Sequence, residues 1–250
     1  MKAIFLTSAL IGAIASPALA EFEQTSISIS HAKSNNAGAT VGAIKAINVN
    51  STYRFGKFGV QGDLSFSRYT DSGKNHGDKD LSLYFFGDIT DSLRAGAFFG
   101  RVDYFGKHAL NTTGVAAQYS IGKFEIAASY TQYSGRKDYA DVKSIELGVD
   151  YRLTDAFTLG LETSFNTTTD QGAGNQKNDF NYAGLRVSYD LPVEGLSLYG
   201  RYGTMDIEGI SKKPSFINIG LTYQFGKGGT HRPFKHAGFM SDARTGLADN

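Results

Sequence analysis

Apolar and polar residues alternate along most of the chain, in segments of about the length that crosses a bilayer as a tilted β-strand. In the segment 216–225, Ile217, Ile219, Leu221 and Tyr223 fall on one face, and the residues between them are mostly polar or small. Successive side chains of a strand point to opposite faces, so this pattern predicts a strand with one apolar face. The same pattern predicts twelve strands in all, at 24–33, 44–55, 57–69, 80–89, 93–104, 110–120, 124–133, 143–153, 157–166, 180–191, 196–206 and 215–225.

The predicted connections alternate between tight turns and longer polar loops. The turns fall at 56–57, 90–92, 121–123, 154–156 and 192–195, and the loops at 34–43, 70–79, 105–109, 134–142, 167–179 and 207–214. This asymmetry is typical of transmembrane β-barrels, whose even number of strands brings both ends of the wall to the side of the short turns. We therefore predict an all-β fold, a transmembrane antiparallel up-and-down β-barrel of about 12 strands. The alternatives are ten or fourteen strands, or a soluble sandwich or lipocalin-like barrel with the aromatic residues in its core.

Aromatic residues of the apolar face gather near both ends of the predicted strands. Those near the turns are Tyr53, Phe55, Tyr119, Phe124, Tyr151, Tyr189, Tyr223 and Phe225, and those near the loops are Phe66, Phe99, Tyr130, Phe165 and Tyr202. Aromatic rings favour the two interfaces of a bilayer, so this distribution predicts an outer face in contact with lipid.

The last predicted strand carries Asn218, Gly220, Tyr223 and a final aromatic residue, Phe225. This arrangement resembles the C-terminal strand of Gram-negative outer-membrane barrels. Together with the strand pattern of 21–225, it makes the chain similar to the porin-like outer-membrane barrel family, as a small porin. The resemblance implies that the four residues are an assembly signal for the barrel-assembly machinery. The loops are shorter than those of large general porins, which argues against a wide, unselective pore.

Residues 1–20 have the features of a secretory signal peptide. Lys2 supplies the positive charge, 4–15 is apolar, and Ala18-Leu19-Ala20 is a small-residue cleavage site. No later window is apolar for the length of a transmembrane helix. We therefore expect export through a cleaved signal peptide, with 21–225 forming a barrel in contact with the lipids of the outer membrane.

Composition argues against several other functions. Removing Lys2 from the 25 basic residues leaves 24, equal to the 24 acidic ones, so no basic surplus favours nucleic acid. The absence of cysteine excludes disulfides and thiolate chemistry. The histidines His76 and His108 fall in loops without clustered ligands, so no metal or other cofactor is predicted.

The predicted inner face is polar and charged. Its candidate lumen-lining residues are Arg54, Asp63, Asp80, Arg94, Glu125, Glu146, Glu162, Arg186 and Arg201. We expect much of this charge to pair across the wall, with Arg94 near Asp88 across a turn and Asp150 near Arg152 on one strand. Inward glycines at 96, 100, 114, 148, 160, 184, 203 and 220 are expected to leave space for a pore.

These features predict a channel for the passive diffusion of small hydrophilic solutes or ions, with a weak preference for cations. One alternative is a closed structural or adhesin-like barrel that acts through its loops or tail. A less favoured one is an outer-leaflet lipid hydrolase built on His31. Ser51 is the nearest outward serine, but the expected hairpin register separates it from His31 by several residues. We therefore predict no enzymatic activity; the solute and the choice between monomer and trimer are left open.

The chain continues past the last predicted strand. Residues 226–250 lack periodicity and are rich in glycine and polar residues, which predicts a disordered periplasmic tail. The alternative is a tail that touches peptidoglycan or partly plugs the lumen.

Overall fold

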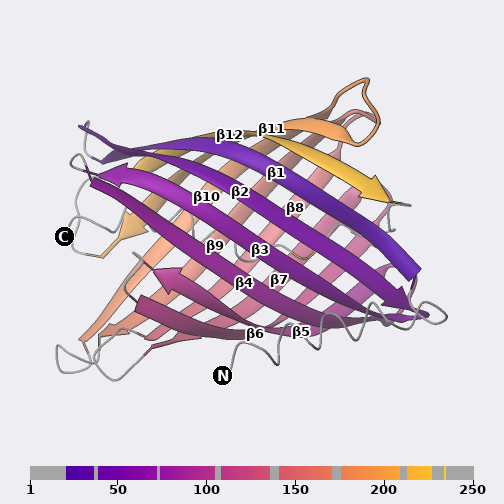
Figure 1. Cartoon of the computed structure of the whole chain (residues 1–250), viewed down its shortest axis with the longest axis horizontal. Helices are drawn as coiled ribbons and strands as arrows, with labels where there is room; N and C mark the ends of the chain where they lie inside the picture. The colour runs from indigo at the N-terminus through magenta and orange to yellow at the C-terminus, as the bar shows by residue number, and fades with distance from the viewer. Residues whose placement is uncertain are drawn as a thin grey trace.

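The computed structural model describes residues 21–36, 39–71, 74–104, 108–135, 141–170, 176–208, 213–226 and 234. Twelve strands form one closed barrel in which each strand pairs with its neighbours in sequence (Figure 1). The strands are β1 Glu21–Asn36, β2 Ala39–Phe55, β3 Phe58–Asp71, β4 Lys74–Asp88, β5 Leu93–Tyr104, β6 His108–Ile121, β7 Phe124–Ser134, β8 Asp141–Arg152, β9 Phe157–Asp170, β10 Gln176–Asp190, β11 Leu196–Ile207 and β12 Ser215–Gly226. The predicted all-β barrel and its number of strands are confirmed.

The wall closes where β1 pairs with β12, antiparallel, from Gln24 opposite Gly226 to Asn35 opposite Ser215. Closure leaves none of the twelve described strands with an unpaired edge. A wall in lipid requires this because no water is there to satisfy free backbone groups. No helix in the described part of the chain is long and apolar enough to cross a membrane.

Tight connections gather at one end of the barrel, called the turn end below. Gly56 and Gly122 have φ of 65° and 59°, a conformation that glycine adopts without steric cost in a two-residue hairpin. In the two turns built on Thr90 and Thr154, the threonine hydroxyl accepts backbone N–H groups, from Leu93 at 3.0 Å and from Phe157 at 3.0 Å. The sequence therefore specifies each of these hairpins locally.

Most strands run further toward the opposite, loop end than predicted. The predicted loop 34–43 is largely taken up by β1 and β2, whose ladder extends to the pair Asn36 and Ala39. The apolar alternation stops before the strand does, because backbone hydrogen bonds continue above the level where side chains need to face lipid. Hydrophobic periodicity therefore located the strands but underestimated their length.

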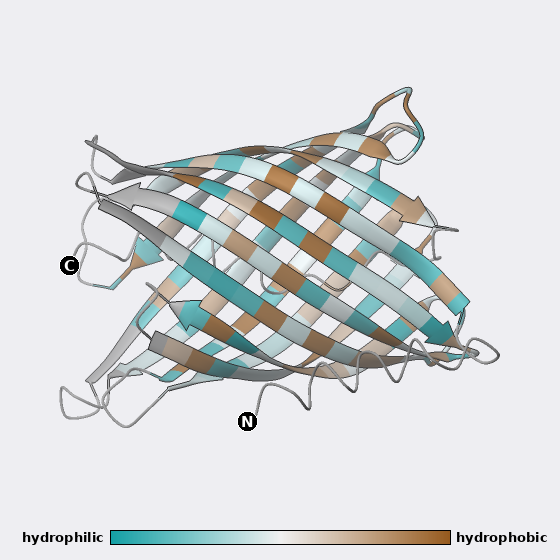
Figure 2. Ribbon diagram, in the orientation of Figure 1, coloured by the Kyte–Doolittle hydropathy of each residue, from teal (hydrophilic) through white to brown (hydrophobic). Residues whose placement is uncertain are grey.

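The outer face is apolar and the inner face largely polar, so the arrangement is the reverse of a soluble barrel. Ile29, Val115 and Leu161 are 53%, 56% and 61% exposed, whereas Gln61 and Ser82 are buried. Figure 2 shows hydrophobic and hydrophilic residues alternating along the strands. Because a protein in water does not expose a continuous apolar belt of this kind, the soluble sandwich and the lipocalin-like barrel are excluded.

The predicted aromatic residues lie on the outer face, and Phe22 joins them at the turn end. Its ring centroid is 5.7 Å from that of Tyr53 and 6.2 Å from that of Phe225. Phe124 and Tyr151 form a second contact at this end, at 4.6 Å. The strands adjoining the seam thus share one aromatic cluster at the membrane interface.

Candidate functional site in the barrel interior

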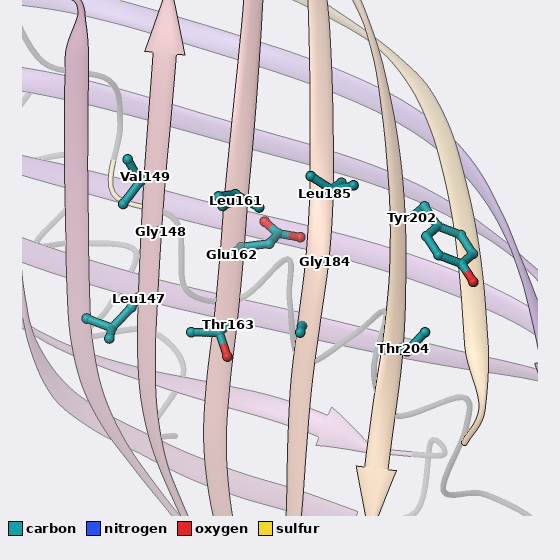
Figure 3. Close-up of a pocket in the computed structure, with 11 residues that line it drawn as sticks. Leu147, Gly148, Val149, Leu161, Glu162, Thr163, Gly184, Leu185, Tyr202 and Thr204 are labelled. Carbon is teal, nitrogen blue, oxygen red and sulfur yellow. The ribbon is translucent and has the colours of Figure 1, made fainter. Parts of the chain in front are cut away.

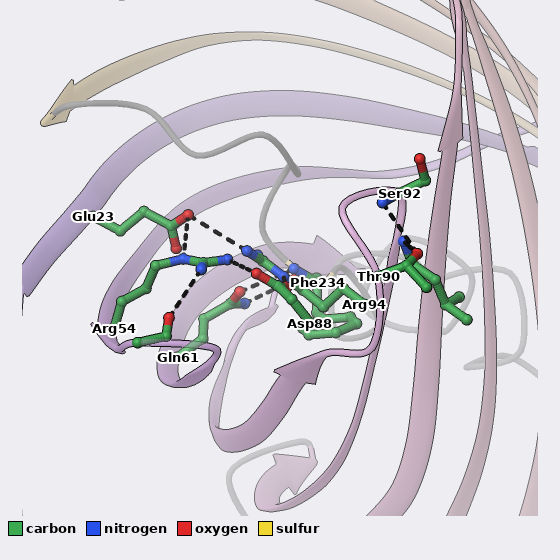
Figure 4. Close-up of polar contacts among 10 residues, drawn as sticks. Glu23, Arg54, Gln61, Asp88, Thr90, Ser92, Arg94 and Phe234 are labelled. Atoms are coloured by element: carbon green, nitrogen blue, oxygen red, sulfur yellow. Dashed lines mark hydrogen bonds and ion pairs between the residues drawn. The ribbon is translucent and has the colours of Figure 1, made fainter.

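Four charged side chains form a network inside the turn end. Arg54 Nε lies 3.0 Å from Glu23 Oε1, and Arg94 Nε lies 2.9 Å from Asp88 Oδ1. Arg94 Nη2 also contacts Glu23 Oε1 at 3.4 Å, and Arg54 pairs with Asp88 as well (Figure 4). Two guanidinium groups thus share two carboxylates, and the side chain of Arg94 is fully buried. The predicted proximity of Arg94 and Asp88 is confirmed.

Glu23 was not among the predicted residues of the lumen. Strict alternation along the first strand places it outside, because Gln24, one position later, faces inward. The register between β1 and β2 shifts between Phe22 and Gln24, and this β-bulge turns both Glu23 and Gln24 into the interior. No local signal in the sequence points to it, because Arg54 and Arg94 lie 31 and 71 positions further along the chain.

A second group of charges lies along β8 to β11. Arg186 pairs with Asp150, and Arg201 Nε lies 2.8 Å from Glu162 Oε1. The Tyr182 hydroxyl donates a hydrogen bond of 2.6 Å to the same Glu162 oxygen. Asp150, which was expected to pair with Arg152, pairs with Arg186 on β10, across the intervening strand β9.

The remaining predicted lumen residues also lie on inward positions of their strands. Asp63 accepts a hydrogen bond of 2.7 Å from Gln61, and Glu146 accepts one of 3.2 Å from Ser129. Asp80 is buried on β4, and Glu125 on β7 is half-buried. All nine candidates therefore face the interior, and five of them, Arg54, Arg94, Glu162, Arg186 and Arg201, take part in the two sets of ion pairs.

Several inward glycines do not leave open space, contrary to expectation. An added Cβ on Gly184 or Gly203 would overlap the ring of Tyr182, and one on Gly114 would overlap the ring of Phe98. The rings lie flat over the backbone of neighbouring strands, where glycine supplies no side chain to hold them off. These glycines accommodate aromatic rings on the inner wall.

The interior also contains aromatic clusters that the sequence did not reveal. One cluster joins Tyr84, Phe86, Phe98 and Ala116 to Phe234, a residue beyond the last strand. Gln61 bonds both backbone groups of Phe234: Phe234 N–H donates to Gln61 Oε1 at 2.9 Å, and Gln61 Nε2 donates to the Phe234 carbonyl at 2.9 Å. Part of the tail therefore lies within the barrel. The other residues of 227–250, like the predicted signal peptide 1–20, lie outside the described residues.

The four residues of the terminal strand divide between its two faces. Asn218 and Gly220 are buried inside, and Tyr223 and Phe225 lie outside with their ring centroids 6.1 Å apart. Phe225 joins the aromatic cluster at the seam, so this strand ends as an integral part of the closed wall.

The pair proposed for lipid hydrolysis is not assembled. His31 lies opposite Lys45, and Ser51 lies opposite Thr25, whose hydroxyl is 2.8 Å from the serine oxygen. Thr25 and His31 are six positions apart on β1, about 20 Å along the strand. Within the described residues, no group of three or more histidines or acids could hold a metal ion either.

The outer wall carries one apolar hollow, between β8 and β11. Its lining includes the smaller residues Thr163, Ala183 and Thr204. Larger side chains such as Leu161 and Tyr202 also line it (Figure 3). Because its large side chains are the exposed ones of the outer face, the hollow faces lipid and not the interior.

Comparison with known proteins points to one class. The sequence profile of a family described as Gram-negative porin matches residues 15–156, more than half of the 250 residues. The NanC porin is 11% identical, with a TM-score of 0.62 over 79% of this chain and 98% of its own. The KdgM porin is 12% identical, with a TM-score of 0.56 over 79% and 99%, respectively. An outer-membrane channel from Pseudomonas putida F1 is 12% identical, with a TM-score of 0.60 over 82% and 95%.

At these identities the solved structures show a shared fold. No curated protein matches this sequence.

Proposed function

The chain belongs to the Gram-negative porin family, and we propose that this outer-membrane channel passes small hydrophilic solutes and ions by passive diffusion. The observation that carries the proposal is the reversal of polarity across the wall. Exposed Ile29 and Leu161 face outward, while the interior holds charged and hydroxyl side chains. A polar interior inside an apolar belt stabilises water where lipid would otherwise exclude it.

In this arrangement the turn end faces the periplasm and the loop end faces outward. Short periplasmic turns and longer outer loops are the usual orientation of bacterial barrels. The outer belt contacts the lipids of the outer membrane, and Asn218, Gly220, Tyr223 and Phe225 are read by the barrel-assembly machinery. The charge network of Glu23 and Arg94 then lies at the periplasmic mouth.

The interior favours cations over anions. The described charged residues on inward positions of the strands include five arginines, Arg54, Arg94, Arg152, Arg186 and Arg201. The acidic residues on such positions include Glu23, Asp63, Asp78, Asp80, Asp88, Glu125, Glu146, Asp150, Glu162 and Asp190. Each arginine neutralises one carboxylate at most, so the wall keeps a net negative charge that raises the local concentration of cations. The bias is weak because both signs are present along the path.

The passage of solutes is further limited by size. A barrel of twelve strands encloses a narrower interior than the sixteen to eighteen strands of large porins. Rings such as Tyr84, Phe98 and Tyr182 occupy part of that interior. We therefore expect small solutes to pass and large oligomers to be excluded.

Single-channel conductance tests the proposal. The mature protein is refolded, inserted into a planar bilayer, and measured first in symmetric salt and then in a salt gradient. We expect discrete, stable current steps. In the salt gradient, the sign of the reversal potential is expected to show that cations permeate better than anions. A folded barrel that carries no current, with or without residues 227–250, would reject the channel in favour of a closed structural barrel.

A further inference from the structure

Phe234 lies inside the barrel although it follows the last strand. We propose that it is an internal plug residue, which binds an aromatic site on the inner wall and restricts flow through the turn end of the channel. The inference rests on the proposed channel function. It concerns a site formed by the wall and occupied by the chain itself.

The site first recognises the side chain of Phe234. The ring lies parallel to that of Tyr84, with centroids 5.5 Å apart and an angle of 5° between planes. It meets the ring of Phe86 edge to face at 5.7 Å and 61°. With only 3% of its surface exposed, Phe234 is as buried as a residue of a soluble protein's core. Both ring geometries are among those that aromatic pairs prefer.

The site also recognises the backbone of Phe234. Gln61 is fully buried, and its amide group both accepts from the N–H and donates to the carbonyl of Phe234, at 2.9 Å each. This pair of hydrogen bonds resembles the pairing with a neighbouring strand. It satisfies the backbone N–H and C=O groups of Phe234, which burial removes from water. A residue that merely fell into the lumen would not have both backbone groups satisfied by one side chain. The contact therefore has the features of a binding site.

The wall is adapted to hold this site open. Gly59 on β3 has no side chain, and an added Cβ there would overlap the ring of Phe86. The guanidinium carbon of Arg94 lies 4.3 Å from the centre of the same ring, on the side supported by Asp88 and Glu23. Figure 4 shows Gln61 and Phe234 next to this charge network. The ion pairs thus fix Phe86, and Phe86 forms one wall of the Phe234 site.

The position of the site determines its effect on flow. Gln61 is the fourth residue of β3 and Phe86 is two residues from the end of β4, so both lie near the turn end. Without an occupant, the rings of Tyr84, Phe86 and Phe98 would line a polar channel, where apolar surface is unfavourable. Occupancy by Phe234 buries that surface and places its ring and its own backbone groups inside the turn end of the channel. With Phe234 bound, the channel is in its restricted form.

Conductance of three variants tests the inference. They are a chain that ends at Gly226, Phe234→Ala, and the matched control Phe239→Ala, which removes another phenylalanine of the same tail. The first two variants are expected to raise the single-channel conductance or the open fraction at least twofold, with the control unchanged. Equal conductance of the native chain, the shortened chain and Phe234→Ala would overturn the plug. Absence of current in every folded variant, the shortened chain included, would instead reject the proposed channel.

A second measurement follows the position of the residue without current. The chain has no tryptophan, so Phe234→Trp introduces a unique indole. In the folded barrel its fluorescence is expected to be shifted to the blue and protected from acrylamide. Adding Gln61→Leu removes both hydrogen bonds to Phe234, together with the one to Asp63, and is expected to increase quenching several-fold. An indole that is quenched as fully in the folded barrel as in urea would overturn the inference.

Discussion

Arg186 on β10 pairs with Asp150 on β8 by passing over Gly160 of the strand between them. Gly160 lies opposite Asp150 in one ladder and opposite Arg186 in the other, so the three residues form one row across the wall. An added Cβ at Gly160 would meet the Asp150 carboxylate and lie 3.2 Å from Arg186 Nε. Arg201 on β11 and Glu162 on β9 also pair across a strand, β10, but not in one row, because Glu162 lies opposite Gly184 and Arg201 lies opposite Arg186. At Gly160 the missing side chain leaves the room through which an ion pair skips a strand.

Gly160→Ala is expected to break the pair between Asp150 and Arg186. Both side chains are largely buried, so the loss should lower the free energy of unfolding by about 1–3 kcal/mol. The measurement is urea unfolding in lipid vesicles. Gly148→Ala is the matched control, because its added Cβ would meet nothing closer than 3.9 Å. Equal losses in the two variants would contradict the role given to Gly160.

Glu23→Gln is expected to weaken the network at the turn end. Glu23 binds both Arg54 and Arg94, and Arg94 is buried without room to reach water. Removing one charge of a buried network leaves the opposite charge uncompensated, and the expected loss is about 3 kcal/mol of unfolding free energy. Glu21→Gln, an exposed position two residues earlier, serves as control and should change stability by less than about 0.5 kcal/mol. An equal effect of both changes would show that the bulge does not place Glu23 in a network.

Neutralising inner carboxylates is expected to reduce the cation preference. The double variant Asp80→Asn, Glu125→Gln removes two negative charges from the wall and retains the size of both side chains. The reversal potential in a tenfold salt gradient should move toward zero by several millivolts, because fixed charge sets the local ion concentrations. Asp103→Asn, on the outer face near the loop end, should leave the potential unchanged. A shift in reversal potential of the same size in Asp103→Asn would show that the cation preference does not depend on the carboxylates of the inner wall.

His31→Ala is expected to have no effect on the rate of phospholipid hydrolysis. The histidine lies on the outer face opposite Lys45, far along the strand from Ser51. Release of fatty acid from phospholipid vesicles should be at background for both the native protein and the variant. Activity that the substitution abolishes would restore the enzyme alternative.

The strand pattern could be predicted from the sequence because each hairpin is specified locally. Alternation places residues on faces, and glycine or threonine fixes the turns, as at Gly56 and Thr90. These signals sufficed for the fold and for the inward placement of charges such as Arg94. They also predicted its contact with Asp88, which lies just across a turn.

Contacts between distant segments could not be predicted in the same way. Glu23 faces inward because of one bulge, and a shift of one residue exchanges the two faces of a strand. Asp150 meets Arg186 rather than Arg152 because of the register of two successive ladders. Phe234 belongs to a segment without periodicity, and nothing local in it indicates the aromatic site on β3, β4 and β5.

The seam between β1 and β12 has a consequence for how the molecule is made. Gln24 and Gln224 are joined across it by a side-chain hydrogen bond of 2.7 Å, and they are 200 positions apart in the chain. The first strand, β1, is synthesised before all the others, and its edge opposite β2 remains unpaired until the last strand, β12, is available. Any shorter nascent chain has two open edges and a face of exposed apolar side chains, which is the form most prone to aggregate. Closure of the wall is therefore an all-or-none event that waits for the twelfth strand.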